Sequence, residues 1–180
     1  MPVYDGDPKL LKDYIAEALL ILMRKMEFDK ITIQDITEKA GVNRSTYYRN
    51  FKSKTDVIRY FYVRCLREYL DTIDGMQISP KDYFVGMFVS FRKHKDALLM
   101  LEEQGFSYLL LDVMNQYFQE DYSEDELLKK YRFYYHTGGV FNTFALWLSD
   151  DMSTEPEELA DLCLRFLPED FRPFLHRPGN

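Results

Sequence analysis

Apolar residues recur at intervals of three and four along most of the chain, which is the spacing of amphipathic helices. The first run places Leu11, Ile15 and Leu19 on one face and predicts a helix over about residues 8–27, with Pro8 at its first position. No stretch of strand length alternates polar and apolar residues between turn signals. The pattern therefore predicts an all-α protein of about nine helices.

Residues 32–51 predict two short helices joined by a tight turn. Thr32 and Asp35 fit a capping box that opens the first helix, and Gly41 fits its end because glycine tolerates a positive φ. Asn43 can cap the second helix. Two short helices around a glycine turn predict a helix-turn-helix, in which the second helix can lie in the DNA major groove.

Later helix starts show a Ser or Thr followed three residues on by an acid. Ser53 is expected to open a long helix to about Ile73, and Ser79 opens the next one. Ser123 and Thr154 precede two further helices near the C-terminus. The last thirteen residues, PEDFRPFLHRPGN, contain three prolines and predict an irregular tail.

Charge is distributed unevenly along the 180 residues. The composition, 46% hydrophobic and 29% charged, is that of a soluble globular protein, and the net charge of −7 would disfavour nucleic acid. Between Lys39 and Arg67, however, there are eight basic residues and one acid, Asp56. A polyanion could therefore bind one end of the molecule while the acidic remainder is repelled.

Membrane, metal and catalytic patterns are not found. No run of about 18 apolar residues occurs and the N-terminus does not resemble a signal peptide, so we expect a cytoplasmic protein with no membrane partner. Cys65 and Cys163 lie far apart in amphipathic runs, which indicates reduced, partly buried thiols. His94, His136 and His176 are isolated, and no HExxH, Walker, GxGxxG or nucleophile-elbow motif is present. We expect no catalytic residue, no metal and no cofactor.

Residues of the predicted second short helix supply hydrogen-bonding groups for DNA. With Tyr47 and Phe51 on the buried face, the outward side chains are Asn43, Arg44, Ser45, Tyr48 and Arg49. Arg44 could contact a guanine edge, Asn43 an adenine and Gln34 a further base. Candidates for phosphate contacts are Thr32, Thr46, Tyr48 and Lys54. A basic cluster is also typical of a solvated face, so a helical adaptor that binds only protein is the alternative.

The stretch ITIQDITEKAGVNRSTYYRNFKSKTDVI resembles the DNA-binding region of the tetracycline-repressor-like (TetR/AcrR) family of bacterial transcription regulators. The resemblance covers about residues 8–60 and rests on the first threonine, the AGV turn, the aromatic pair, the Phe and the Lys that opens the long helix. It departs at Tyr47, where the family more often has Phe or Leu. The resemblance implies that these residues face DNA: Thr32, Gln34, Asn43, Arg44, Ser45, Tyr48, Asn50 and Lys54.

The resemblance also implies an architecture and a mode of action. Residues 1–53 would form the helix-turn-helix domain, and residues 54–180 a helical domain for effector binding and dimerisation. The protein would be a sequence-specific regulator of transcription, acting as a homodimer on a pseudo-palindromic operator in double-stranded DNA. It would most often be a repressor, released by an effector that is either a small molecule or a protein.

Two sets of residues in the second domain follow from the resemblance. The dimer would be held by helices at about residues 124–150 and 155–167, with candidate contacts at Gly138, Gly139, Trp147, Leu159 and Leu162. The two glycines fit either a close helix contact or a break between two helices. A supply of aromatic and methionine residues fits either an effector pocket or an ordinary core: Phe88, Phe91, Met100, Tyr108, Phe141 and Phe144.

Overall fold

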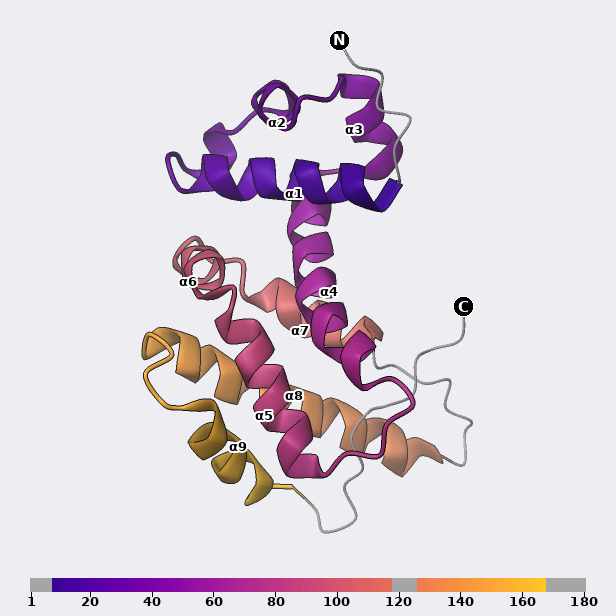
Figure 1. The fold of residues 1–180 in the computed structure, drawn as a ribbon, viewed down its shortest axis with the longest axis vertical. Coiled ribbons are helices and arrows are strands. Elements are labelled where there is room, and N and C mark those ends of the chain that lie inside the picture. The colour runs from indigo at the N-terminus through magenta and orange to yellow at the C-terminus, as the bar shows by residue number, and fades with distance from the viewer. Residues whose placement is uncertain (1–7, 118–125, 168–180) are drawn as a thin grey trace. The chain divides into compact units, whose positions relative to one another are not determined.

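The computed structural model of the chain describes residues 8–117 and 126–167. Within these residues it contains nine α-helices, one short 3-10 helix and no strand, which confirms the all-α prediction (Figure 1). The chain divides into two compact units, Met1–Tyr62 and Val63–Asn180, and α4 (Lys54–Ile73) begins in the first and ends in the second. The functional division expected between residues 53 and 54 lies at the start of this helix and stays a prediction.

The first unit contains α1 (Pro8–Met23), the 3-10 helix η1 (Phe28–Lys30), α2 (Ile33–Ala40), α3 (Arg44–Asn50) and the beginning of α4. The regular part of α1 ends four residues earlier than expected, because the chain tightens after Met23 and the Lys25 N–H donates to the Leu22 carbonyl. Buried side chains from the four α-helices and from the residues that follow η1 and α3 form the core: Ile15, Leu19, Ile31, Ile36, Tyr47, Phe51 and Ile58.

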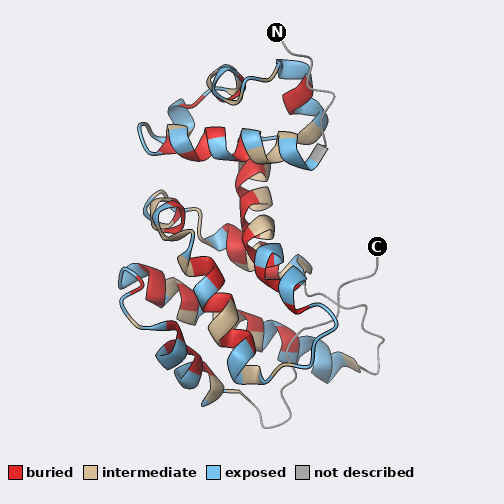
Figure 2. Ribbon diagram, viewed as in Figure 1, coloured by how far each residue is buried: buried red, intermediate tan, exposed pale blue. Residues whose placement is uncertain are grey.

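The second unit contains the end of α4 together with α5 (Pro80–Arg92), α6 (Lys95–Glu103), α7 (Tyr108–Tyr117), α8 (Leu127–Ser149) and α9 (Pro156–Leu164). α5 packs along α9, and α8 packs against α6 and α7. Figure 2 shows buried positions alternating with exposed ones along α5, as expected for a helix with one face on the core.

Of the helix starts predicted from Ser or Thr caps in the second unit, one is confirmed and one is shifted by a residue. Ser79 caps α5 as predicted, since its hydroxyl accepts a hydrogen bond from the Asp82 N–H (3.1 Å). At the start of α9, Glu155 rather than Thr154 occupies the cap position, and Pro156 is the first helical residue. Ser123 and the tail at 168–180 lie outside the described residues. α8 runs without interruption through both of its glycines, so the predicted alternative of a break at that point is wrong.

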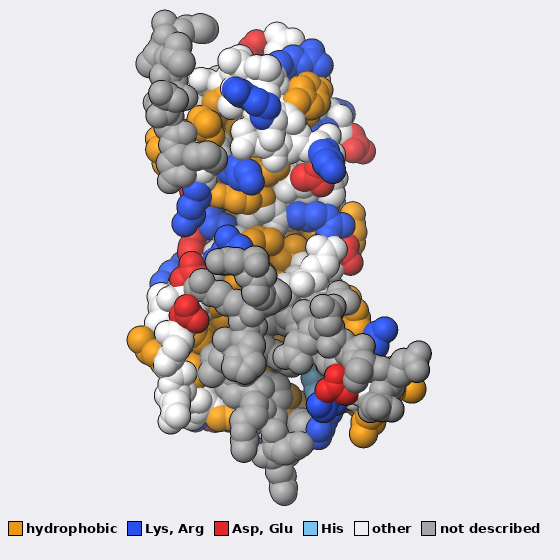
Figure 3. Space-filling model, turned by 90° about the vertical axis from the view of Figure 1, so that its right-hand side faces the viewer, with side chains coloured by type: hydrophobic (Ala, Val, Ile, Leu, Met, Phe, Trp, Pro, Cys, Tyr) orange, Lys and Arg blue, Asp and Glu red, His pale blue; other side chains and the backbone are white. Residues whose placement is uncertain are grey.

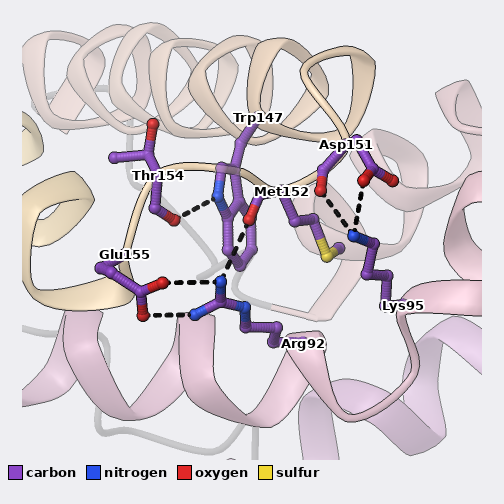
Figure 4. A network of polar contacts seen from close by, with 7 residues as sticks. All are labelled: Arg92, Lys95, Trp147, Asp151, Met152, Thr154 and Glu155. Carbon is purple, nitrogen blue, oxygen red and sulfur yellow. Dashed lines mark hydrogen bonds and ion pairs between the residues drawn. The ribbon is translucent and has the colours of Figure 1, made fainter.

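The loop between α8 and α9 is held against the junction of α5 and α6 by polar contacts (Figure 4). Asp151 and Met152 both adopt left-handed backbone conformations (φ 54° and 50°), which disfavour residues with a Cβ. The Lys95 ammonium donates to the Asp151 carbonyl (2.7 Å) and forms an ion pair with its carboxylate (2.9 Å). Arg92 donates to both carboxylate oxygens of Glu155 (2.6 and 3.0 Å) and to the Met152 carbonyl (3.3 Å). These bonds stabilise an otherwise unfavourable turn.

None of the described helices is long and apolar enough to cross a membrane. Cys65 and Cys163 are both buried, as expected of cysteines within amphipathic runs. Burial raises the pKa of the Cys163 thiol to about 11, so this thiol stays protonated near neutral pH.

Candidate nucleic-acid interface

The N-terminus of α2 is closed by a complete capping box. The Thr32 hydroxyl accepts a hydrogen bond from the Asp35 N–H (3.1 Å) and donates to the Asp35 carboxylate (2.7 Å), which also accepts from the Thr32 N–H (2.8 Å). The bond from the Thr32 hydroxyl and then that from its backbone hold the pKa of Asp35 below its usual range. Thr32 lies on the exposed surface as predicted, but its hydroxyl already serves the helix.

The turn between α2 and α3 depends on a left-handed glycine. Gly41 has φ 69°, and the Val42 N–H returns to the Thr37 carbonyl (3.0 Å), which ends α2 in one residue. Asn43 then caps α3, since its amide oxygen accepts from the Thr46 N–H (2.8 Å) and from the Ser45 hydroxyl (2.7 Å). The amide oxygen of Asn43 is therefore engaged, and its NH2 group remains to contact a base.

α3 has one buried face and one exposed face. Tyr47 is fully buried on the inner face, and its ring centroid lies 6.1 Å from that of Phe51. Because this packing fixes the position of α3 in the unit, the outer face of the helix points in a constant direction. The exposed residues of α3 are Arg44, Ser45, Tyr48 and Arg49.

Two of these exposed side chains contact each other. The Arg44 guanidinium donates to the Tyr48 hydroxyl (3.4 Å), and its central carbon lies 5.8 Å from the centroid of the Tyr48 ring. The pair sits on successive turns of α3, which limits the conformations open to Arg44 before DNA binds. Fewer conformations to lose means a smaller entropic cost on contact with a base.

Three residues predicted to contact DNA are engaged by hydrogen bonds within the chain. Thr46 is only 8% exposed, because it lies on the inner side of α3, where its hydroxyl accepts from Arg49 (3.0 Å). Asn50 is half-buried and donates to the Thr46 carbonyl (2.8 Å). Gln34 is exposed but donates its amide hydrogen to the Glu38 carboxylate (2.8 Å). Of the three, only Gln34 is exposed, and it could contact DNA only by giving up this bond to Glu38.

Lys54 is also engaged within the unit. Its ammonium donates to the carbonyl oxygens of Phe28 (2.5 Å) and Ile31 (2.7 Å), at the junction before α2. Sequence reasoning identified Lys54 by its place at the start of α4 but missed these partners, because they lie 26 and 23 residues away. Two further lysines, Lys39 and Lys52, are exposed and could contact phosphates, but the sequence analysis did not name them as DNA contacts. Their position in the basic segment between Lys39 and Arg67 could have indicated this role. In Figure 3 several Lys and Arg side chains lie among hydrophobic ones over the first unit.

Residues 15–61 match the family model described as bacterial regulatory proteins of the tetR family. The chain is 22% identical over 173 residues to the uncharacterized HTH-type transcriptional regulator YxbF of Bacillus subtilis (strain 168), covering 85% of this chain and 43% of that protein. It is 28% identical over 93 residues to YvdT of the same organism, also an uncharacterized HTH-type transcriptional regulator, covering 48% of each protein. The chain thus spans less than half the length of these curated relatives.

Two solved structures share the fold. A TetR transcriptional regulator from Streptococcus agalactiae 2603V superposes with a TM-score of 0.57 at 19% identity, over 88% of this chain and 93% of the other. The dihydroxyacetone kinase operon activator DhaS superposes with a TM-score of 0.52 at 16% identity, over 87% and 93%. The capped helix-turn-helix thus lies within the residues, 15–61, that match the model of the tetR family of bacterial regulatory proteins, and the two solved structures share the fold of the chain around it.

Proposed function

We propose that the protein is a sequence-specific DNA-binding regulator of transcription whose α3 enters the major groove. The observation that carries the proposal is the division of α3 into a buried face, with Tyr47, and an exposed face with Arg44, Tyr48 and Arg49. A rigid helix with exposed hydrogen-bond donors can read base edges, and cations beside it can contact phosphates. From such a role in a bacterium we infer a location in the cytoplasm, and the role requires no catalytic group.

The test of this proposal is selection of bound fragments from a random pool of DNA duplexes. Related, dyad-symmetric fragments are expected. Arg44→Ala should then lose about 1–3 kcal/mol of discrimination at one base pair in each half-site, measured by competition against duplexes changed at each position. Arg24→Ala, which changes an exposed arginine in the turn that follows α1, is the matched control. An adaptor that binds only protein would recover no related fragments and would be indifferent to Arg44→Ala.

We also propose that the protein works as a two-fold dimer formed through α8 and α9. Apolar side chains lie exposed along one face of α8 at helical spacing: Leu128 (80% exposed), Tyr131 (69%), Tyr135 (78%) and Leu146 (63%). Gly138 and Gly139 lie between them, and a Cβ at either position would meet no atom within 4 Å. A second helix could therefore approach the α8 backbone closely at this point.

The residues predicted for the dimer divide into two groups. Gly138, Gly139 and Leu162 belong to surfaces that a partner could reach. Trp147 is only 2% exposed and donates from Nε1 to the Thr154 carbonyl (2.9 Å), and Leu159 is also buried. Trp147 and Leu159 pack inside their own chain and are not available to a partner. We propose that the exposed residues Leu146 and Phe166 contact the second copy instead.

The effector is proposed only as a class. The predicted pocket residues Phe88, Phe91 and Phe144 are buried together, with Phe91 and Phe144 ring centroids 5.0 Å apart. Met100 and Phe141 are partly exposed and Tyr108 is exposed. Glu102, Asn115 and Thr137 each have a buried side-chain oxygen with no hydrogen-bond partner among the described residues. Such oxygens would favour a ligand with N–H or O–H donors.

Regulation by such an effector requires that it bind the DNA-free arrangement more tightly than the DNA-bound one. We propose that the protein represses transcription, because a dimer bound to an operator at a promoter would exclude RNA polymerase. Thermal-shift screening of amines against carboxylic acids, followed by transcription in vitro with the selected duplex, tests both statements. If only carboxylic acids stabilised the protein, the proposed class of ligand, one with N–H or O–H donors, would be wrong. If the bound protein increased transcription, the proposed repression would be wrong.

A further inference from the structure

Lys54 has its ammonium enclosed by backbone and by an aromatic ring. Nζ lies 2.5 Å from the Phe28 carbonyl oxygen, 2.7 Å from the Ile31 carbonyl oxygen and 4.3 Å from the centroid of the Phe28 ring. An ammonium has three N–H donors and no acceptor. Two of the donors serve the carbonyl oxygens, and the ring face covers a third side of the charge.

The two carbonyl groups belong to the segment from which α2 starts. Phe28 opens η1, and Ile31 follows the end of η1 with its side chain fully buried. The next residue is Thr32, the cap of α2. The hydrogen bonds of the capping box are all local to residues 32–35, so they shape the first turn of α2 but do not attach it to another helix. Lys54 supplies that attachment from the start of α4.

We propose that Lys54 is a positioning residue for DNA recognition: it holds the N-terminus of α2, and hence the turn into α3, in the orientation that docks on DNA. Its ammonium does this from inside the unit and does not itself contact a phosphate. A phosphate could take only the third N–H without breaking a hydrogen bond to a carbonyl, and the Phe28 ring covers that side of the ammonium; a contact through either of the other two donors would release the junction before α2. This inference rests on the proposed function as a DNA-binding protein.

The experiment compares three variants of the full chain with the wild type. Lys54→Met keeps the aliphatic stem and removes the ammonium, and Lys54→Arg keeps a charged donor. Lys52→Met removes the same charge from an exposed lysine two residues earlier and is the matched control. Affinity for one selected duplex is measured at several salt concentrations, at a temperature where every variant is folded by circular dichroism. Amide hydrogen exchange is measured on the free proteins.

Lys54→Met is expected to weaken binding by roughly tenfold or more, because hydrogen bonds to a charged group are lost at a site that orients the docking face. The slope of log affinity against log salt should equal that of the wild type, since no phosphate contact is removed. Exchange of the Ile33 and Gln34 amides should accelerate in the free protein. Lys54→Arg should recover most of both losses, and Lys52→Met should leave the exchange unchanged.

Two results would overturn the inference. A salt slope reduced by about 0.9 in Lys54→Met, with unchanged exchange, would mean that the ammonium contacts a phosphate. A lower melting temperature with wild-type affinity in the folded state would mean that Lys54 only stabilises the unit. If the wild type selected no duplex, the proposed function would fail; the exchange data would still decide whether Lys54 holds the start of α2.

Discussion

Tyr47 carries a hydroxyl group into the core of the first unit. Its side chain is fully buried, and its hydroxyl oxygen has no hydrogen-bond partner among the described residues. Leaving a buried hydroxyl unpaired costs about 1–3 kcal/mol. The ring fills the space between α3 and its neighbours, while the hydroxyl contributes nothing that the structure shows.

Tyr47→Phe is therefore expected to raise the free energy of unfolding by about 1 kcal/mol at neutral pH, because it removes the unpaired group and keeps the ring. Urea denaturation followed by circular dichroism measures the change. Tyr48→Phe, which alters the neighbouring exposed tyrosine, should change stability by less than about 0.5 kcal/mol. Equal effects of the two substitutions would contradict the interpretation.

The same substitution should change the response to alkaline pH. Burial, and next the carboxylate of Asp56, raise the pKa of Tyr47 above its ordinary value of 10.0. A raised folded-state pKa means that the titration of Tyr47 costs no stability below pH 10, and that the free energy of unfolding falls as pH rises from there through the folded-state pKa. Burial also raises the pKa of Tyr83, and that of Tyr69 to about 12, so Tyr47→Phe should reduce the loss of stability above pH 10 without abolishing it.

At the scale of residues, an interaction could be predicted from the sequence when its two partners lie close together along the chain. The caps at Thr32 and Asn43 could be predicted because their partners lie three residues away and the capping rules are local. The engagement of Lys54 could not, since its partners lie more than twenty residues away and are backbone oxygens with no sequence signal. The burial of Thr46 was missed because each residue of an α-helix turns the side-chain direction by about 100°, so Thr46, next to the buried Tyr47, already faces inward although Ser45 is exposed.

Among the helices, α4 and α5 make a close contact at a glycine. A Cβ at Gly86 would lie 2.4 Å from Cε2 of Tyr69, closer than real side chains approach. The Tyr69 ring has little room to move, because it is buried, its hydroxyl donates to the Asp82 carbonyl (3.2 Å), and its centroid lies 6.0 Å from that of Tyr83. Gly86 is therefore required for the distance between these helices.

Gly86→Ala is expected to destabilise the protein by about 1–3 kcal/mol, since overpacking at Tyr69 exceeds the roughly 1 kcal/mol by which alanine favours a helix over glycine. Thermal unfolding of a double-mutant cycle with Tyr69→Leu measures the coupling. In the Tyr69→Leu background the ring is absent, and Gly86→Ala should be neutral or stabilising. A cost that is the same in both backgrounds would show that Tyr69 is not the reason for the glycine.

At the scale of elements, periodicity and caps were enough to predict the all-α class and a number of helices, about nine, that agrees with the nine found in the described residues. The extent of α4 to Ile73 and the start of α5 after Ser79 follow the prediction, because hydrophobic spacing and capping agree there. The two glycines of α8 could not be interpreted, since the penalty of about 1 kcal/mol per glycine in a helix can be offset by packing that the sequence does not specify. The start of α9 was displaced by one residue because Pro156 favours the first helical position.

For the whole molecule, the function proposed for α3 requires a second copy. One helix-turn-helix reads only a few base pairs, and two recognition helices read a pseudo-palindrome when they are held about 34 Å or a multiple apart. The resemblance predicted the helices that would form the dimer, and the structure shows which of their faces is exposed. That the exposed face includes Leu146 and excludes Trp147 depends on how α8 rotates against its own core, which one sequence does not determine.

A variant with glutamate at both Tyr135 and Leu146 tests the dimer. Each glutamate would place a negative charge on the exposed face of α8, where a second copy would bury both charges and repeat them across the two-fold axis. At micromolar concentration the wild type should sediment at twice the monomer mass of 21.6 kDa and the variant at that mass, with an unchanged circular dichroism spectrum.

The DNA affinity of the same variant connects the dimer with the regulator. Without the partner, each helix-turn-helix binds its half-site independently and loses the effective concentration that linkage supplies, so affinity for a dyad-symmetric duplex should fall by about 10²–10⁴-fold. Tyr108→Glu changes an exposed tyrosine on α7 and should leave both mass and affinity unchanged. A variant that stays dimeric would move the interface away from this face of α8. A monomer that kept full affinity would show that dimerisation is not needed for DNA binding.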